Sequence, residues 1–239
     1  MDAHHPPAAE GPPVRRPRSA RGRARAVSEL LAAEFPRYRV PLDHRSAFQL
    51  LAATILSAQC TDAMVNRVTP ALFARYPDAA TMAAAPVEDL EALIRPTGFF
   101  RSKARSLLGM SSAVAGRFGG DVPGRMEDLI TLPGVGRKTA SVILGHWFGV
   151  PAIPVDTHVL RLSARLGLSE ATDPERVERD LAGLLPRRDW TDTSMRLIFH
   201  GRRTCTARAP RCGACVLAGF CPSARRPTAP RGPRAPARR

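Results

Sequence analysis

The chain has 239 residues, of which 44% are hydrophobic and only 5% aromatic, so a sizeable aliphatic core can form in one large domain or two small ones. Ala and Leu dominate and β-branched residues do not alternate, which favours an all-α fold and argues against a mainly β protein. The formal net charge of +15 raises the question of nucleic-acid binding without establishing it, and no apolar run is uninterrupted over a membrane span.

The excess positive charge is concentrated at the two ends of the chain. Residues 1–25 hold six Arg against Asp2 and Glu10, and residues 223–239 hold six Arg and no acid. Both ends are rich in proline, so we predict that both are disordered basic tails. Such tails attract nucleic acid, but an Arg- and Pro-rich genome would give the same composition. No apolar segment follows the first arginines, which predicts a cytoplasmic protein without a signal peptide.

Between the tails, apolar residues recur at helical spacing. Ser28 is the predicted N-cap of a first helix over Glu29–Phe35. Further helices are predicted over Arg45–Ser57, Asp62–Ala74, Val87–Ile94, Ser102–Phe118, Met126–Thr131, Arg137–Phe148, Thr157–Leu166, Pro174–Leu184 and Trp190–Arg202. Short segments with Gly, Pro or Asp separate them, and no segment has the pattern of a strand.

A tight turn, LPGVG, joins the predicted helices that begin at Met126 and Arg137. Gly134 and Gly136 can adopt positive φ and allow close backbone approach. Exposed amides at a helix N-terminus bind phosphate, so we predict a helix–hairpin–helix that grips one DNA strand without sequence preference. A plain αα-hairpin is the alternative. The expected DNA contacts are Leu132, Gly134, Val135, Gly136, Arg137 and Thr139.

Lys138 is unusual, because 34 of the 36 basic residues are Arg and Lys103 is the other Lys. Ala140, Ile143, Leu144 and Trp147 form a stripe that should face the core. Lys138 lies about 200° from Ala140 around the helix and therefore points to a cleft or to solvent. A lysine amine can act as a nucleophile, whereas a guanidinium stays charged. The alternative is an ordinary surface lysine.

Asp156 precedes a helix in the segment PVDTHVLRL. It is a good N-cap, and that role alone would explain it. A carboxylate at a helix start can also point into a cleft beside Lys138, and the two roles are compatible.

Four cysteines, Cys205, Cys212, Cys215 and Cys221, lie within seventeen residues with the spacing C-x6-C-x2-C-x5-C. A segment this short has little core, and disulfides are uncommon in cytoplasmic proteins, so we predict a metal site. The spacing leaves zinc and an iron–sulfur cluster equally open. Arginines including Arg208 and Arg211 flank these ligands, and no acid follows Asp192. They either offset the thiolate charge or contact DNA phosphates.

These motifs together resemble one family. LLAATILSAQCTD (Leu50–Asp62), LPGVGRKTA followed by VDTHV, and the four cysteines are similar to endonuclease III, a DNA glycosylase of the helix–hairpin–helix superfamily. The resemblance implies two helical domains that flank a DNA cleft. One is a six-helix barrel over residues 45–152, which carries the hairpin over 126–148. The other is a cluster domain made of residues 26–44 and 153–222.

The resemblance also implies roles for individual residues. Lys138 would be the nucleophile, Asp156 the catalytic carboxylate, and the four cysteines would hold a [4Fe-4S] cluster rather than zinc. Gln59 and Phe99 would insert into the space left by a flipped base. Phe99 departs from the smaller aliphatic residue that is common there.

The implied function is that of a bifunctional DNA glycosylase and AP lyase for oxidised pyrimidines. We expect a bacterial monomer at the nucleoid, acting on duplex DNA with damaged bases or abasic sites. A mismatch-specific adenine glycosylase usually lacks this Lys and has a further domain, whereas only eighteen residues follow Cys221 here. A non-catalytic iron–sulfur DNA-binding protein would need neither Lys138 nor Asp156.

Overall fold

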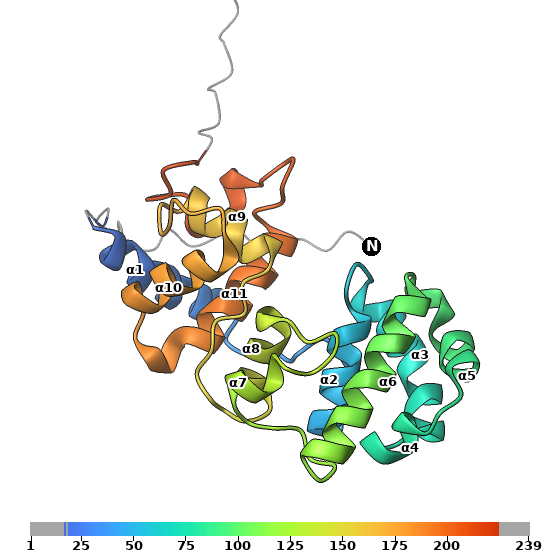
Figure 1. Ribbon diagram of the computed structural model, residues 1–239. Helices are drawn as coiled ribbons and strands as arrows, with labels where there is room; N and C mark the ends of the chain where they lie inside the picture. Colours follow the sequence, from blue (N-terminus) through green and yellow to red (C-terminus); the bar gives the residue numbers. More distant parts are fainter. Residues whose placement is uncertain (1–16, 18, 225–239) are drawn as a thin grey trace, which may run out of the picture.

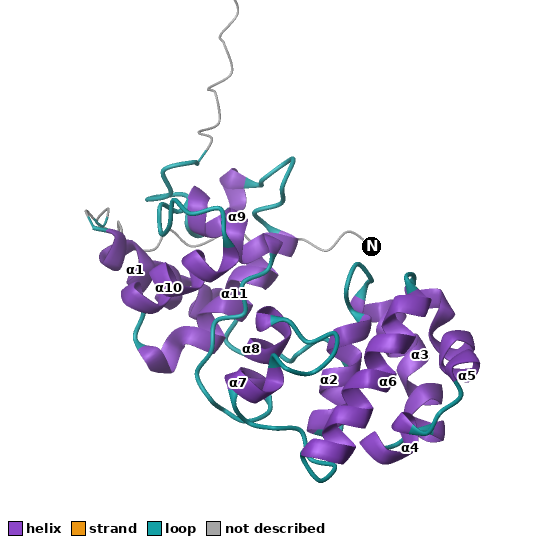
Figure 2. Cartoon of the chain, in the orientation of Figure 1, coloured by secondary structure: helices purple, strands orange, loops and turns teal. Residues whose placement is uncertain are grey.

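A computed structural model describes residues 17 and 19–224, and all regular structure within them is helical, as the sequence predicts (Figures 1 and 2). No helix in these residues is both long and apolar enough to cross a membrane. The helices are α1 (Ala20–Glu34), α2 (Ala47–Leu56), α3 (Asp62–Arg75), α4 (Ala79–Ala83), α5 (Val87–Ile94), α6 (Phe100–Arg117), α7 (Met126–Leu129), α8 (Arg137–His146), α9 (Thr157–Arg165), α10 (Pro174–Leu184) and α11 (Trp190–Arg203), with 3-10 turns η1 (Arg95–Thr97), η2 (Arg187–Asp189) and η3 (Cys212–Ala214).

The buried apolar side chains form two separate clusters. The first lies within residues 42–152, and we call α2–α8, which enclose it, the central lobe. The second combines residues 24–31 with residues 153–220, and we call α1, α9–α11 and the cysteine segment the terminal lobe. Figure 1 shows α1 in blue beside α10 and α11 in orange, although most of the chain separates them. Whether the lobes fold as independent domains with the predicted boundaries stays a prediction.

The first helix begins nine residues before the predicted start, so the prediction of a disordered tail through residue 25 was wrong for residues 20–25. Ser19 caps α1 by accepting from the Gly22 amide at 3.1 Å. Ala24 is fully buried, and the Arg23 guanidinium donates to the carbonyls of Leu166 and Gly167 at 3.1 and 2.7 Å. The alternating Arg and Ala residues gave no sign of a helix in the sequence, because the residues that stabilise this helix lie far along the chain. The rest of that tail, residues 1–16 and 18, and residues 225–239 lie outside the described residues.

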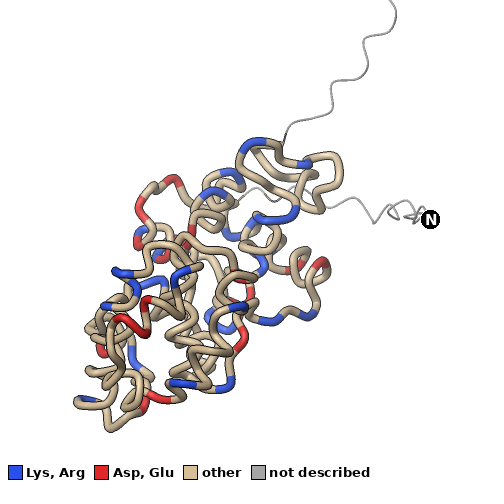
Figure 3. Tube along the Cα trace, turned by 90° about the vertical axis from the view of Figure 1, so that its right-hand side faces the viewer, with Lys and Arg blue, Asp and Glu red and all other residues tan. Residues whose placement is uncertain are grey.

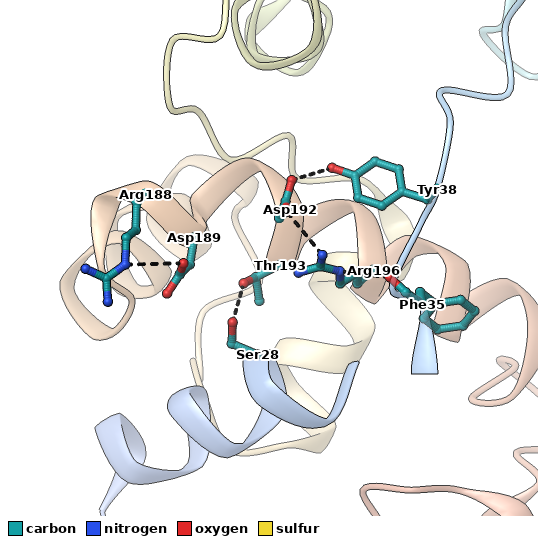
Figure 4. Close-up of polar contacts among 8 residues, drawn as sticks. All are labelled: Ser28, Phe35, Tyr38, Arg188, Asp189, Asp192, Thr193 and Arg196. Atoms are coloured by element: carbon teal, nitrogen blue, oxygen red, sulfur yellow. Dashed lines mark hydrogen bonds and ion pairs between the residues drawn. The ribbon is translucent and has the colours of Figure 1, made fainter. Parts of the chain in front are cut away.

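Polar contacts fix α1 and the following segment to α11 (Figure 4). Ser28 and Thr193 share a hydrogen bond of 2.9 Å, and the Tyr38 hydroxyl donates to Asp192 at 2.7 Å. Arg196 pairs with Asp192 at 3.1 Å and donates to the Phe35 carbonyl at 3.2 Å. The segment that follows α1 therefore runs along α11 before the chain enters the central lobe.

Two further differences from the predicted elements have local causes. Helix α4 was missed because five residues are too few for a periodic pattern, and a capping box between Asp78 and Thr81 defines it instead. Trp147 was predicted to face the core, but α8 ends at His146 and the Trp147 side chain is 41% exposed. The other members of that stripe, Ala140, Ile143 and Leu144, are buried as predicted.

Candidate active site and cysteine site

The turn between α7 and α8 is built around one glycine with a special conformation. Gly134 has φ +76°, and a Cβ added to it would lie 2.6 Å from the Ser106 side chain on α6. Both backbone conformation and space therefore require glycine there. Gly136 has φ −89° and acts as the N-cap of α8, so the positive φ that we considered for both glycines applies only to Gly134.

The hairpin exposes backbone groups rather than apolar side chains. Leu132 and Val135, both predicted DNA contacts, are buried in the central core, so only their backbone can reach a ligand. The Val135 amide bonds to the Leu132 carbonyl at 3.1 Å. The amides of Gly134 and Gly136 make no hydrogen bond with any described residue, and both glycines are exposed. With the first-turn amides of α8, including that of Thr139, they provide donors suited to a phosphate.

Arg137, another predicted DNA contact, is held by the protein itself. Its guanidinium forms a bidentate ion pair with Glu178 of α10, with N–O distances of 2.6 and 3.0 Å. The carboxylate raises the pKa of Arg137. The pair joins the central lobe to the terminal lobe immediately before Lys138. A DNA contact by Arg137 would have to compete with Glu178.

Lys138 lies in the first turn of α8 with its side chain exposed, which agrees with the predicted orientation. It lines a recess of about 40 Å³ together with Ile153, Val155 and Glu175. Its amine makes no hydrogen bond or ion pair with any described residue. The recess brings Lys138 beside Val155, the residue that precedes Asp156.

Asp156 is the N-cap of α9, as predicted. One carboxylate oxygen, Oδ1, accepts from the amides of His158 and Val159 at 2.8 and 2.9 Å. No described residue donates a hydrogen bond to the second oxygen. The half-buried side chain is therefore fixed by its cap while it keeps acceptor capacity for another partner.

Gln59 and Phe99 share a rare backbone conformation. They are the only non-glycine residues with positive φ in the described part of the chain, at +51° and +48°. Gln59 lies in the turn between α2 and α3, and Phe99 precedes α6 with its side chain 66% exposed. Non-glycine residues in this region carry backbone strain, which concentrates at functional sites.

The four predicted cysteine ligands line one cavity of about 180 Å³ in the terminal lobe, together with residues of α9 and α11. Among the described residues, no three His, Cys, Asp or Glu side chains are arranged to hold a metal ion. The cavity is several times the roughly 30 Å³ of a water molecule. Four thiols that line one cavity of this size provide ligands and space into which an iron–sulfur cluster fits. Burial raises the pKa of Cys215 to about 11, so metal binding must displace a proton from this thiol.

Comparison with known proteins agrees with both sites. Residues 52–187 match the model of the HhH-GPD superfamily of base excision DNA repair proteins, and residues 205–221 match the iron–sulfur binding domain of endonuclease III. The chain is 53% identical over 212 residues to Endonuclease III of Synechocystis sp.. The matched residues cover 88% of this chain and 97% of that protein. It is 39% identical to Endonuclease III of Escherichia coli K12 over 78% of this chain and 88% of that protein. This chain belongs to the endonuclease III family.

Solved structures of that family agree in fold. A trapped endonuclease III–DNA covalent intermediate is 42% identical and superposes with a TM-score of 0.82 over 85% of this chain and 96% of that chain. The protein is accordingly a DNA glycosylase and AP lyase of base excision repair, and its cofactor is a [4Fe-4S] cluster. The resemblance thus settles the choice between zinc and iron that the cysteine spacing left open.

Three residues that contact the cysteine segment of this endonuclease III homologue were missed from the sequence. Arg165 donates to Cys205 Sγ at 3.2 Å and to the carbonyls of Thr206 and Ala207 at 2.8 Å each. Arg161 donates to the Cys205 carbonyl at 2.9 Å. His200 is buried between Glu34 and Cys215, with its Nε2 3.4 Å from Cys215 Sγ. The i, i+4 spacing of the two arginines on α9 was the available signal.

Arg208 and Arg211 remain exposed beside the cluster site. Figure 3 shows this part of the chain at the top of the view with blue and without red segments, in line with the absence of acids after Asp192. Other arginines of the flank have protein partners instead, because Arg196 pairs with Asp192 and Arg202 pairs with Asp62. The side chains of Arg203, Arg208 and Arg211 are exposed and make no hydrogen bond or ion pair with any described residue, and of these Arg211 also lines the cluster cavity.

Proposed function

We propose that this member of the endonuclease III family removes oxidised pyrimidines from duplex DNA and cuts the strand 3′ to the resulting abasic site through a Schiff base on Lys138. The observation that carries the proposal is the Lys138 amine, which is exposed on the first turn of α8 and lacks a partner among the described residues. An ion-paired lysine would have to lose its partner before it could attack, whereas this amine is already accessible.

The chemistry follows from the amine. As the Lys138 nitrogen bonds to C1′ of the sugar, the bond from C1′ to the base breaks, and its electron pair leaves with the base, which takes up a proton. Opening of the sugar ring gives a Schiff base. Loss of a proton from C2′ then expels the 3′ phosphate with the electron pair of the C3′–O bond. Asp156 either accepts the proton from Lys138 or stabilises the positive charge that builds up on the sugar.

The remaining site residues bind and deform the DNA. The hairpin amides of Gly134 and Gly136 would hold phosphates, with Arg208 and Arg211 on a second part of the backbone. Gln59 and Phe99 would fill the space of the extruded base, whose removal from the stack costs less for a lesion. The proposed steps require no change in the oxidation state of the cluster. Its role is therefore structural, and it supplies folding energy to the cysteine segment. We place this activity in a monomer acting on DNA with damaged bases or abasic sites at the bacterial nucleoid.

Borohydride trapping on duplex DNA with an oxidised pyrimidine tests the proposal. Borohydride reduces the Schiff base to a stable amine, so the wild-type enzyme should become covalently bound to the DNA. Lys138→Arg keeps the charge and most of the DNA affinity but cannot form the Schiff base, so trapping should be lost. Trapping that survives in Lys138→Arg would remove Lys138 from this role, and its absence in the wild type would overturn the proposed lyase chemistry.

A further inference from the structure

The chain's other lysine occupies the opposite environment from Lys138. Lys103 lies on α6 with only 5% of its surface exposed, and it is the only Lys, Arg, Asp or Glu buried to this extent among the described residues. Its Nζ donates to the Thr97 carbonyl at 2.8 Å. No described carboxylate pairs with it. Burial lowers the pKa of this amine, which reflects the cost of holding its charge inside the protein.

An apolar side chain would serve the packing of α6 at lower cost. A buried cation without a counter-charge is destabilising, and a well-packed hydrophobic residue in its place is often neutral or stabilising. The neighbours Ala104 and Leu107 on the same helix are fully buried in the central core. Lys103 therefore has a task other than filling space.

The position of Lys103 connects it to both strained turns. Its backbone amide bonds to the Phe99 carbonyl at 3.1 Å, and its side chain bonds to the Thr97 carbonyl, two residues before Phe99. The buried Thr97 hydroxyl in turn donates to the Ile94 carbonyl at 2.8 Å. The backbone bond is the ordinary first bond of α6, so the bond from the side chain to the Thr97 carbonyl is the contact that depends on lysine.

The second strained turn, which carries Gln59, leads into a helix that packs against the turn held by Lys103. Helix α3, which begins at Asp62, packs against η1, the turn that contains Thr97. The turn that Lys103 holds is therefore packed between α6 and α3, and both Gln59 and Phe99 are exposed.

We propose that Lys103 is a positioning residue that holds Phe99 in the left-handed conformation needed to enter DNA when a base is extruded. This inference rests on the proposed function. Lys103 is too deeply buried to touch DNA and acts through the carbonyl of Thr97. A lysine suits this task because its compact ammonium has three donors on a flexible stem, whereas a guanidinium would not fit the same buried space.

Lys103→Met tests the inference, with Arg105→Met as a matched control on the same helix. Arg105 is exposed and makes no hydrogen bond or ion pair with any described residue. Base extrusion is measured by stopped-flow fluorescence of 2-aminopurine placed next to an oxidised pyrimidine. Without the bond to Thr97 we expect extrusion and single-turnover excision to slow about tenfold, while Arg105→Met stays at the wild-type rate.

Two readouts separate positioning from a purely structural role. On DNA with a preformed abasic site no base has to be extruded, so borohydride trapping by Lys103→Met should stay within about twofold of wild type. In a Phe99→Ala background, Lys103→Met should slow extrusion no further, because the residue through which it acts is gone. Wild-type extrusion in Lys103→Met, or equal slowing with and without Phe99, would overturn the inference.

A failure of this inference can be distinguished from a failure of the proposed function. If the wild type itself is not trapped on abasic DNA, the Lys138 chemistry is wrong, whereas normal wild-type trapping with unaffected extrusion in Lys103→Met refutes only the role of Lys103. If Lys103→Met does not fold, Lys103→Gln keeps a donor for the Thr97 carbonyl and should extrude bases at an intermediate rate. Equal slowing of extrusion and of trapping on preformed abasic DNA in folded Lys103→Gln would also overturn the inference, because the defect would not be confined to the step in which Phe99 enters the DNA.

Discussion

The hairpin and the cysteine segment are both short irregular stretches beside basic residues, yet their polar groups are used in opposite ways. In the hairpin, the amides of Gly134 and Gly136 and the Lys138 amine have no partner among the described residues. In the cysteine segment, Arg161 and Arg165 bind carbonyls and a thiol. An open set of donors suits a ligand that comes and goes, and a closed set suits a group that stays.

The two regions also differ in what holds their shape. The hairpin is anchored by Leu132 and Val135, which are buried in the central core. The cysteine segment contributes mainly Leu217 and Phe220 to the terminal core. Packing can therefore preorganise the hairpin before DNA arrives, whereas the cysteine segment depends on its cluster. Each of the following predictions tests one side of this contrast.

The largest effect is expected at Asp156, which belongs with Lys138 to the proposed active site. Asn can also cap a helix, so Asp156→Asn should change the free energy of unfolding by less than about 1 kcal/mol. Single-turnover base excision should nevertheless fall by about 10²–10⁴-fold, because Asn neither accepts a proton nor carries a charge. Excision rate and melting temperature are measured on the same preparation. Near-normal excision would leave Asp156 with its capping role alone.

Changes in the cysteine segment should affect iron content and the stability of the protein. Purified enzyme should contain close to four irons per chain, and Cys212→Ser should lose iron and soluble yield because one of four thiolate ligands is missing. Cys60→Ser is the matched control, since Cys60 lies in the central lobe outside the cavity. Iron content and visible absorbance follow both variants. Full iron in Cys212→Ser, or equal loss in Cys60→Ser, would contradict the assigned ligand set.

The link between the two lobes should have a smaller effect. Arg137 and Glu178 are partly exposed, so breaking their ion pair by Arg137→Ala or Glu178→Ala should cost about 1 kcal/mol of stability or less. The double variant should cost less than the sum of the two. DNA affinity is measured over a range of salt. A salt slope lower by about 0.9 in Arg137→Ala would show that Arg137 leaves Glu178 for a phosphate when DNA binds.

How well the sequence predicted each region depends on whether the residues that stabilise it lie within the same segment or far along the chain. Helices α5 and α10 match their predicted ranges, because their apolar periodicity lies within the segment itself, and Asp173 caps α10 locally. The hairpin was predicted for the same reason, although the structure was needed to assign positive φ to Gly134 and not to Gly136. Leu132 and Val135 stay predicted DNA contacts, through their backbone groups, because their side chains are buried.

Contacts between distant segments were not predictable in this way. Helix α1 is stable because Arg23 binds carbonyls more than 140 residues away, which no local pattern reveals. The cysteine spacing identified the ligands, but Arg161 and Arg165 reach them from α9, some 40 residues earlier. The burial of Lys103 was likewise invisible, because a lysine within a helix is expected to be exposed.

A change in salt dependence alone, with stability and iron content unchanged, tests whether the cysteine segment also has a surface open to DNA. Arg208 and Arg211 are exposed and lie beside the cluster cavity, and no Asp or Glu follows them in the sequence. If each neutralises one phosphate, the double change Arg208→Ala and Arg211→Ala should make the dependence of log affinity on log salt shallower by up to about 1.8, with iron content unchanged. The matched control is Arg187→Ala with Arg188→Ala, which removes two exposed charges from the same lobe away from the cavity. The control should keep the wild-type slope, because charge that is not in contact with phosphate releases no counterions. An equal change in both variants would mean that only overall charge matters, and an unchanged slope in the first would confine DNA binding to the hairpin side.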